Sequence, residues 1–267
     1  MIKTEKPLEF TQIKHFVAPD SIVRKIWGKA DTILFIFAGA SAEFALNKAV
    51  DWLYFTGRLP SDPLGRLFST VSYARQIVFS EYNQALLAID KITSIHQVVE
   101  QKRAAQIPDW AYRDVLFMLI DYSIRAFELM ERKLTEEEKK ETFNVFYRVG
   151  ARMGIRRRFT SFYSCQINAG GTYSGQPIIE RLYSLDLYRQ YKKHLGFICF
   201  ILKQAQTLVV PQRVNRLLRL GNIPIFALVV GSYKFMKLLK VESYLKNMIL
   251  PEAYKLQIAA LDTDIIA

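Results

Sequence analysis

One of the three histidines in the sequence lies where an imidazole could serve as a ligand from inside a helical core. His96 stands in the segment ALLAIDKITSIHQVVEQK, where Ile89 and Ile92 precede it by seven and four residues and Val99 follows it by three. These spacings place the four side chains on one face of an α-helix, so we expect the imidazole to point inward. A buried histidine is more often a hydrogen-bonded core residue than a ligand, and both interpretations are open on the residues alone.

The pattern around His96 suits a cofactor that needs a single axial nitrogen. No second histidine, no His-Glu-x-x-His motif and no cluster of carboxylates stands near it in the sequence, so a zinc site with three or four ligands is poorly supported. Haem needs one proximal histidine, an apolar pocket and a few polar groups on the distal side. If His96 is a ligand, the sequence therefore favours haem iron as its partner.

A second group of residues that could do chemistry lies between Ser61 and Phe79. Arg66 and Thr70 are four residues apart, so they share a helical face. Apolar residues continue that side of the helix, which predicts a partly buried guanidinium that needs an anionic or dipolar partner. The partner is either a carboxylate in an internal ion pair or dioxygen at the cofactor, with the Thr70 hydroxyl alongside. The apolar residues on this side are Leu67, Val71 and Ala74.

Helical periodicity recurs along the chain without sustained alternation, which predicts an all-α protein with a single multi-helix domain over residues 1–267. Thr135 and Glu138 form a capping box, Pro63 after Asp62 marks a helix start, and Gly57 and Gly154 stand where helices should end. The predicted helices cover residues 20–29, 32–55, 63–80, 82–103, 108–132, 136–152, 185–207, 211–219, 222–239 and 251–261.

Two segments are not predicted to be helical. Residues 1–19 are expected to form an N-terminal tail. Residues 156–184 carry Gly170-Gly171, Gly175 and Pro177 among polar residues, which predicts a long irregular connection. Connections of this length are commonly functional or disordered, so a lid over a pocket is one interpretation.

The chain is basic, with 37 Lys and Arg against 25 Asp and Glu and a net charge of +12. Such an excess suits nucleic acid, an anionic membrane surface or an acidic ligand. The basic runs have no RNP-like strand, zinc knuckle or helix-turn-helix signature beside them, so we predict no nucleic-acid binding. Arg213, Arg216 and Arg219 recur every three residues in a basic amphipathic helix. That helix either contacts a membrane peripherally or presents an ordinary solvated face.

No stretch of the sequence predicts a membrane span. Residues 220–233 contain a proline and are shorter than the roughly 18 to 20 residues that a span requires, and residues 32–50 are interrupted by Glu43 and Lys48. Cys165 and Cys199 lack the spacing of a metal site and the density of a secreted scaffold, and charges in the first ten residues argue against a signal peptide. We therefore expect a cytoplasmic protein, with membrane association left open.

Six short motifs, taken in order, resemble those of one oxygenase family. Their order and spacing over about residues 20–262 are similar to the family of latex-clearing protein (rubber oxygenase) and the ER-bound oxygenases of the mpaB type. The motifs are DPLGRLFST at 62–70, IHQV at 95–98, GARMGI at 150–155, YKKHLG at 191–196, QAQTLVVPQRV at 204–214 and LPEAY at 250–254.

The resemblance implies a globin-like helical core with haem b and oxidative cleavage of a carbon–carbon double bond in an isoprenoid or lipid-like substrate. By motif, His96 matches the proximal iron ligand, and Arg66 and Thr70 match residues of the distal pocket. The implied partners are dioxygen and a hydrophobic small molecule. The alternative is a protein of this fold that holds haem or lipid without turnover, and the sequence leaves the oligomeric state open.

Several positions depart from the family. Rubber-cleaving members have a distal glutamate upstream of the arginine, where residues 47–51 read Asn-Lys-Ala-Val-Asp and Asp51 is the nearest acid. A His-Pro pair of many relatives is Lys48-Ala49, and Glu100 replaces a glycine that often follows the His-x-x-Val element. Residues 156–184 have almost no likeness to the family. These departures concern the substrate lid and the distal acid, and they motivate the alternative without turnover.

Overall fold

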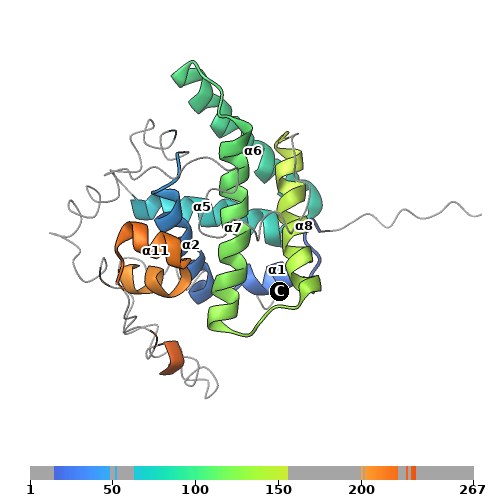
Figure 1. Cartoon of the computed structure of the whole chain (residues 1–267). Coiled ribbons are helices and arrows are strands. Elements are labelled where there is room, and N and C mark those ends of the chain that lie inside the picture. Colours follow the sequence, from blue (N-terminus) through green and yellow to red (C-terminus); the bar gives the residue numbers. More distant parts are fainter. Residues whose placement is uncertain are drawn as a thin grey trace, which may run out of the picture.

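Helices make up the regular structure in the described part of the chain. The computed structural model describes residues 15–48, 52, 63–155, 200, 202–221, 227 and 230–232, and only the backbone of 63–68. Its named helices are α1 (Ile22–Trp27), α2 (Ala30–Phe44), α5 (Pro63–Phe79), α6 (Tyr82–Arg103), α7 (Asp109–Met130), α8 (Glu136–Arg152) and α11 (Gln212–Leu218) (Figure 1). Residues 202–209 are also helical, and the described strand-like structure is an isolated bridge between His15 and Glu81. The predicted all-α class is confirmed.

Several predicted helix bounds agree with the structure. The helices predicted at 82–103 and 136–152 have these bounds, and α5 and α7 lie within two residues of the predicted 63–80 and 108–132. Gly154 follows α8 with φ +81°, as expected of a glycine that ends a helix. Predictions outside the described residues concern Gly57, Asp62, most of the tail at 1–19 and of the helix at 185–207, the connection at 156–184 and most or all of the helices at 222–239 and 251–261.

The helix predicted over 32–55 is wrong at its C-terminal end. α2 ends at Phe44, and residues 45–48 form turns in which Asn47 N donates to Phe44 O at 3.0 Å. The Asn47 side chain then donates from Nδ2 to Asp114 Oδ2 of α7 at 2.9 Å. α2 thus ends beside a contact with α7, a helix far along the chain. The apolar periodicity of the sequence continues past this point, so it predicted a longer helix.

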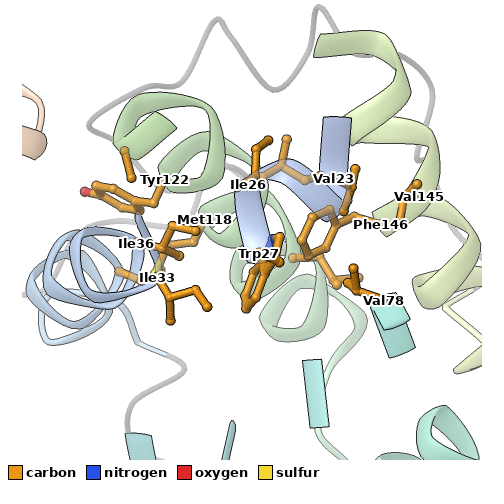
Figure 2. Packing of buried hydrophobic residues seen from close by; sticks show 14 of the residues in the cluster. Val23, Ile26, Trp27, Ile33, Ile36, Val78, Met118, Tyr122, Val145 and Phe146 are labelled. Carbon is orange, nitrogen blue, oxygen red and sulfur yellow. The ribbon is translucent and has the colours of Figure 1, made fainter. Parts of the chain in front are cut away.

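The core is centred on Trp27 at the end of α1, whose side chain is 1% exposed. Figure 2 shows Phe146 of α8 on one side of the indole and Ile33 of α2 with Met118 of α7 on the other. The ring centroids of Trp27 and Phe146 are 6.2 Å apart. A short helix such as α1 gains most of its stability from this packing, because so few residues cannot sustain a helix by propensity alone.

α2 and α7 form the most extensive helix pair of the described chain. Lys29 before α2 pairs with Glu131 after α7 at 2.7 Å, and Asn47 beyond the other end of α2 bonds Asp114 near the start of α7. The contacts therefore run in opposite order along the two helices, which makes the pair antiparallel. This arrangement places the middle of α2 against the middle of α7.

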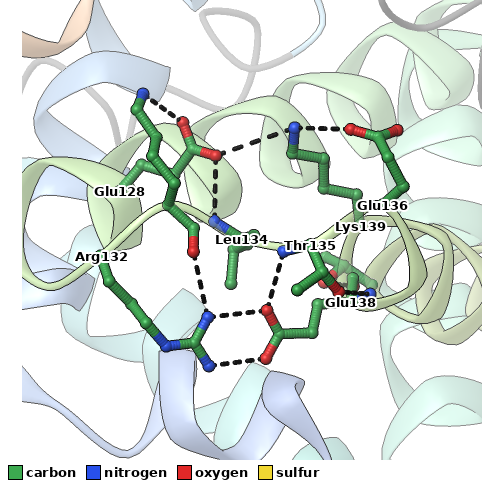
Figure 3. Close-up of polar contacts among 9 residues, drawn as sticks. Glu128, Arg132, Leu134, Thr135, Glu136, Glu138 and Lys139 are labelled. Atoms are coloured by element: carbon green, nitrogen blue, oxygen red, sulfur yellow. Dashed lines mark hydrogen bonds and ion pairs between the residues drawn. The ribbon is translucent and has the colours of Figure 1, made fainter.

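The predicted capping box fixes the corner between α7 and α8 (Figure 3). Glu138 N donates to Thr135 Oγ1 at 3.2 Å, and Thr135 N donates to Glu138 Oε2 at 2.9 Å. Arg132 binds both oxygens of Glu138, at 2.7 and 2.8 Å, and these hydrogen bonds are the main reason that the pKa of Glu138 falls to about 2. Glu128 accepts from Leu134 N at 3.2 Å, so side chains hold the corner on both sides.

α5 and α6 follow one another directly and contact where Lys91 Nζ lies 5.7 Å from the centroid of the Tyr73 ring. Figure 1 shows the C-terminal turns of α6 extending beyond the other described helices before the chain turns into α7. None of the helices in the described ranges has a stretch long and apolar enough to cross a membrane.

Candidate functional site

His96 lies in the second half of α6, whereas the buried residues of that helix, Ala85, Ala88 and Ile89, all lie in its first half. Ile89 on the same face is 0% exposed, while His96, Ile92 and Val99 are half-buried. The imidazole meets the ring of Tyr112 from α7 edge to face, with ring centroids 5.2 Å apart and planes at 84°. The imidazole therefore contacts α7, and the role of His96 as a ligand stays a prediction.

Glu100 and Tyr112 form the other part of the α6–α7 corner. Glu100 Oε1 accepts a hydrogen bond from Ile107 N at 2.8 Å, and the Tyr112 hydroxyl lies 3.5 Å from the same oxygen. Burial, followed by the negative charge of Glu100, raises the pKa of the Tyr112 phenol well above its usual value. The phenol thus stays protonated and donates. Glu100, which stands where relatives often have glycine, binds the loop after α6.

The two residues predicted for the distal side lie on α5. Thr70 is exposed, whereas its neighbour Val71 is 2% exposed and Ala74 packs against the core. The buried face of α5 is therefore turned by one residue from the face that Thr70 occupies. Arg66 lies on the first turns of α5, and its side chain is outside the described part of the chain. The distal roles of Arg66 and Thr70 stay predictions.

The described contacts group His96 with α7 and with its own helix. The same helix ends in Arg103, which is half-buried. Its Cζ lies 4.2 Å from the centroid of the Trp52 ring. Arg103 follows His96 by seven residues, which is two helical turns, so the two share a face of α6. Sequence reasoning did not identify Tyr112 or Arg103, although the seven-residue spacing from His96 was visible.

Glu43 is a buried acid that belongs to no motif in the sequence. It is 4% exposed within the α2–α7 interface and accepts a hydrogen bond from the Tyr122 hydroxyl at 2.7 Å. Burial raises the pKa of Glu43 to about 7, against the lowering effect of that hydrogen bond. In the sequence, this residue reads as an interruption of an apolar run. The spacing that hints at its role is Gly39 one turn earlier, which leaves room for the Tyr122 ring.

Asn47 occupies the neighbourhood where rubber-cleaving relatives have an acid, and its role here is structural. Its side chain is 4% exposed and donates to Asp114, which is fully buried. This contact joins the turn after α2 to α7 and gives two buried polar groups a hydrogen-bond partner. The segment that begins with Asn47 is therefore anchored in the core at its first residue.

The side chains around His96 have the chemistry that haem requires on its proximal side. His96 supplies a nitrogen that can bind iron, and Ile92 and Val99 supply apolar surface on each side of it along α6. The described ranges contain no cluster of three or more His, Cys, Asp or Glu side chains that could hold a metal ion. A haem group needs only one such ligand from this side, so the donor set fits it.

Comparison with known proteins identifies the family. Neither the curated proteins nor the solved structures contain a match to this chain. A family model described as "ER-bound oxygenase mpaB/B'/Rubber oxygenase, catalytic domain" matches residues 25–161, which are 137 of the 267 residues. The match includes α5, α6 and α7 with Arg66, Thr70 and His96, while the three C-terminal motifs lie beyond it. The predicted resemblance is confirmed, and the chain belongs to the mpaB/rubber oxygenase catalytic-domain family.

Proposed function

We propose that this protein is a haem b-dependent oxygenase that cleaves a carbon–carbon double bond in a hydrophobic, isoprenoid or lipid-like substrate. Membership of an oxygenase family supports the reaction class. The observation that supports haem as the cofactor is the position of His96, which is half-buried on α6 between Ile92 and Val99. One dioxygen adds across the double bond, and each of its oxygens ends in one of two carbonyl products.

In this proposal each residue has a distinct task. His96 binds the iron, and when bound the haem supplies the activation of dioxygen. The edge contact with Tyr112 fixes the plane of the His96 ring, since the imidazole cannot rotate without losing it. Arg66 and Thr70 would donate hydrogen bonds to dioxygen, the role that the family resemblance gives them. The apolar side chains along α6 keep water from the ligating nitrogen.

The visible spectrum of the protein tests the cofactor. The purified chain, as isolated and after reconstitution with haem, should show a Soret band with the features of histidine ligation. His96→Ala should remove that ligation, whereas His15→Ala, beside Glu81 at the N-terminal end of α6, should keep it. A wild-type protein without a Soret band, or a His96→Ala protein with an unchanged one, would overturn the proposal.

Turnover needs a separate experiment, because the exposed Thr70 and the structural role of Asn47 favour a second candidate, a protein that holds haem or lipid without reaction. Oxygen uptake by the haem-loaded protein should be measured with a panel of isoprenoids, and the products analysed for paired carbonyl fragments. Substrate-dependent uptake with such fragments supports the oxygenase. Normal haem ligation without uptake across the panel supports the binding protein.

A peripheral membrane contact remains part of the proposal for the basic C-terminal helix. Arg213, Arg216 and Arg219 are exposed on and just after α11, while Val214 between them is 0% exposed. The exposed arginines thus lie on the solvent side of α11 and its apolar side faces the protein. Co-sedimentation with vesicles containing anionic lipid at low salt should show binding that is lost at high salt, and absence of binding at low salt would exclude it.

A further inference from the structure

The face of α6 that carries His96 is different at its two ends. Toward the N-terminus it consists of small and apolar side chains, and Ala85 and Ile89 on it are both 0% exposed. Toward the C-terminus it ends in Arg103, which is half-buried. Seven residues separate His96 from Arg103, a rise of about 10 Å along the helix axis. The face therefore offers a cation at one end and none at the other.

The guanidinium of Arg103 is held in place by an aromatic ring. Its Cζ lies 4.2 Å from the centroid of the Trp52 ring, a distance typical of a cation–π contact. A stacked guanidinium keeps its N–H groups in the plane of the fork, where they can bind a carboxylate with two parallel hydrogen bonds. Lys102, the preceding residue, is exposed and points about 100° away around the helix.

Haem carries its two propionate carboxylates along one edge of the ring, while its other edges are apolar. A ring centred on iron at His96 and lying along α6 has edges toward Ile89 and toward Arg103. Ile89 is 0% exposed, so the carboxylate edge is not expected at that end, where an unpaired buried carboxylate would be strongly unfavourable. Arg103 can neutralise and bind the carboxylate edge.

We propose that Arg103 binds a propionate carboxylate of the haem and thereby sets the orientation of the ring in the site, an inference that rests on the proposed function. Glu100 lies on the same face between His96 and Arg103, and its Oε1 is turned to the loop after α6, where it accepts from Ile107 N at 2.8 Å. The competing account is that Lys102 and Arg103 only complement the negative end of the α6 dipole.

Two ligands separate these accounts, namely haem and its dimethyl ester, in which both carboxylates are esterified. The dissociation constants of both should be measured by Soret titration for wild type, Arg103→Met and the matched control Lys102→Met. Arg103→Met keeps the length of the apolar stem and removes only the charged fork. We expect it to weaken haem binding about tenfold and to leave the ester within about twofold, the scale of one charge-assisted hydrogen-bonded pair. Lys102→Met should leave the dissociation constants of both ligands unchanged.

Each other outcome overturns the inference. Equal weakening of both ligands by Arg103→Met, or no weakening of either, would assign Arg103 to helix stability alone. If wild type and both single variants bind haem with the same dissociation constant, the proposed function stands, but Arg103 has no role in haem binding. Absence of a Soret band with both ligands in wild type removes the proposed function itself. If Arg103→Met does not fold, Arg103→Lys replaces it, because an ammonium cannot form the bidentate pair, and a smaller loss confined to haem is expected.

Discussion

The hydroxyl of Tyr122 donates a 2.7 Å hydrogen bond to the carboxyl group of Glu43 inside the α2–α7 interface. Tyr122 is 0% exposed and Glu43 is 4% exposed, so neither group reaches bulk water. Arg125 is a cation whose charge acts on the carboxyl, but it is bonded to Asp121 at 2.6 Å, and in the described chain no ion pair involves Glu43. A carboxyl buried with one phenolic donor favours its neutral form, and burial raises its pKa to about 7.

The first prediction is that Glu43 makes the protein less stable as the pH rises. The unfolded carboxyl has a pKa near 4.5 and the folded one about 7, so between these values the folded state holds a proton that the unfolded state has lost. The contribution is complete below pH 4.5 and is lost as the pH rises through 7. Over this window the free energy of unfolding should fall by about 3 kcal/mol relative to Glu43→Gln.

Chemical denaturation of wild type and Glu43→Gln at several pH values from 4.5 to 8.5 measures this difference. Glu81→Gln, an exposed acid before α6, serves as the matched control and should follow the wild-type curve. The groups that act on Glu43 from α7 are Tyr122, Asp121, Arg125 and Asp114. Parallel curves for wild type and Glu43→Gln over the whole range would show that Glu43 is ionised in the folded protein.

The second prediction concerns the other partner. Tyr122→Phe removes the donor that lowers the pKa of Glu43, so that pKa should rise further above about 7. The free energy of unfolding should fall by about 1 to 3 kcal/mol, and by more at pH 8.5 than at pH 5, because the hydrogen bond to an ionised acceptor is the stronger one. In the Glu43→Gln background the same substitution should cost less at pH 8.5. An equal cost in both backgrounds would mean that the two residues are not coupled.

The third prediction uses Gly39, where the ring of Tyr122 lies directly against the α2 backbone. A Cβ at this position would clash with Cδ1 and Cε1 of Tyr122 and would lie 2.9 Å from Val209 Cγ1. Gly39→Ala should therefore destabilise the protein by about 1 to 3 kcal/mol through overpacking, despite the higher helix propensity of alanine. Gly231→Ala is the control, since a Cβ there has no atom within 4 Å. Thermal unfolding of the two variants should separate them, and equal midpoints would refute the close contact.

The sequence allowed helix bounds to be predicted where local signals set them and failed where a distant helix does. α8 begins at its predicted capping box because Thr135 and Glu138 bond each other within one turn. The end of α2 was not predictable, since Asn47 meets an acid 67 residues away. The single domain over residues 1–267 and the cytoplasmic location stay predictions.

The same division applies to the site. Spacing within its own helix predicted the face of α6 on which His96 lies, whereas the half-burial of its side chain and its ring contact with Tyr112 depend on how α6 and α7 pack. Thr70 was assigned to the apolar side of α5, but the buried face runs through Val71, a rotation of about 100° that an amphipathic pattern of modest contrast does not resolve. Glu43 was missed because its partner lies on another helix.

The last prediction tests how Tyr112 positions His96. The two rings meet with centroids 5.2 Å apart and planes at 84°, and the hydroxyl of Tyr112 lies 3.5 Å from Glu100 Oε1. Tyr112→Phe keeps the ring and should leave haem affinity within about twofold, while Tyr112→Leu removes the edge contact and should weaken it about tenfold, within the range of losses caused by altering the support of a metal-binding histidine. Soret titrations of both variants, with Tyr147→Leu on exposed α8 surface as control, measure the effect. A Tyr112→Phe protein as impaired as Tyr112→Leu would transfer the positioning role from the ring to the hydroxyl and Glu100, because only that hydroxyl distinguishes phenylalanine from the native residue.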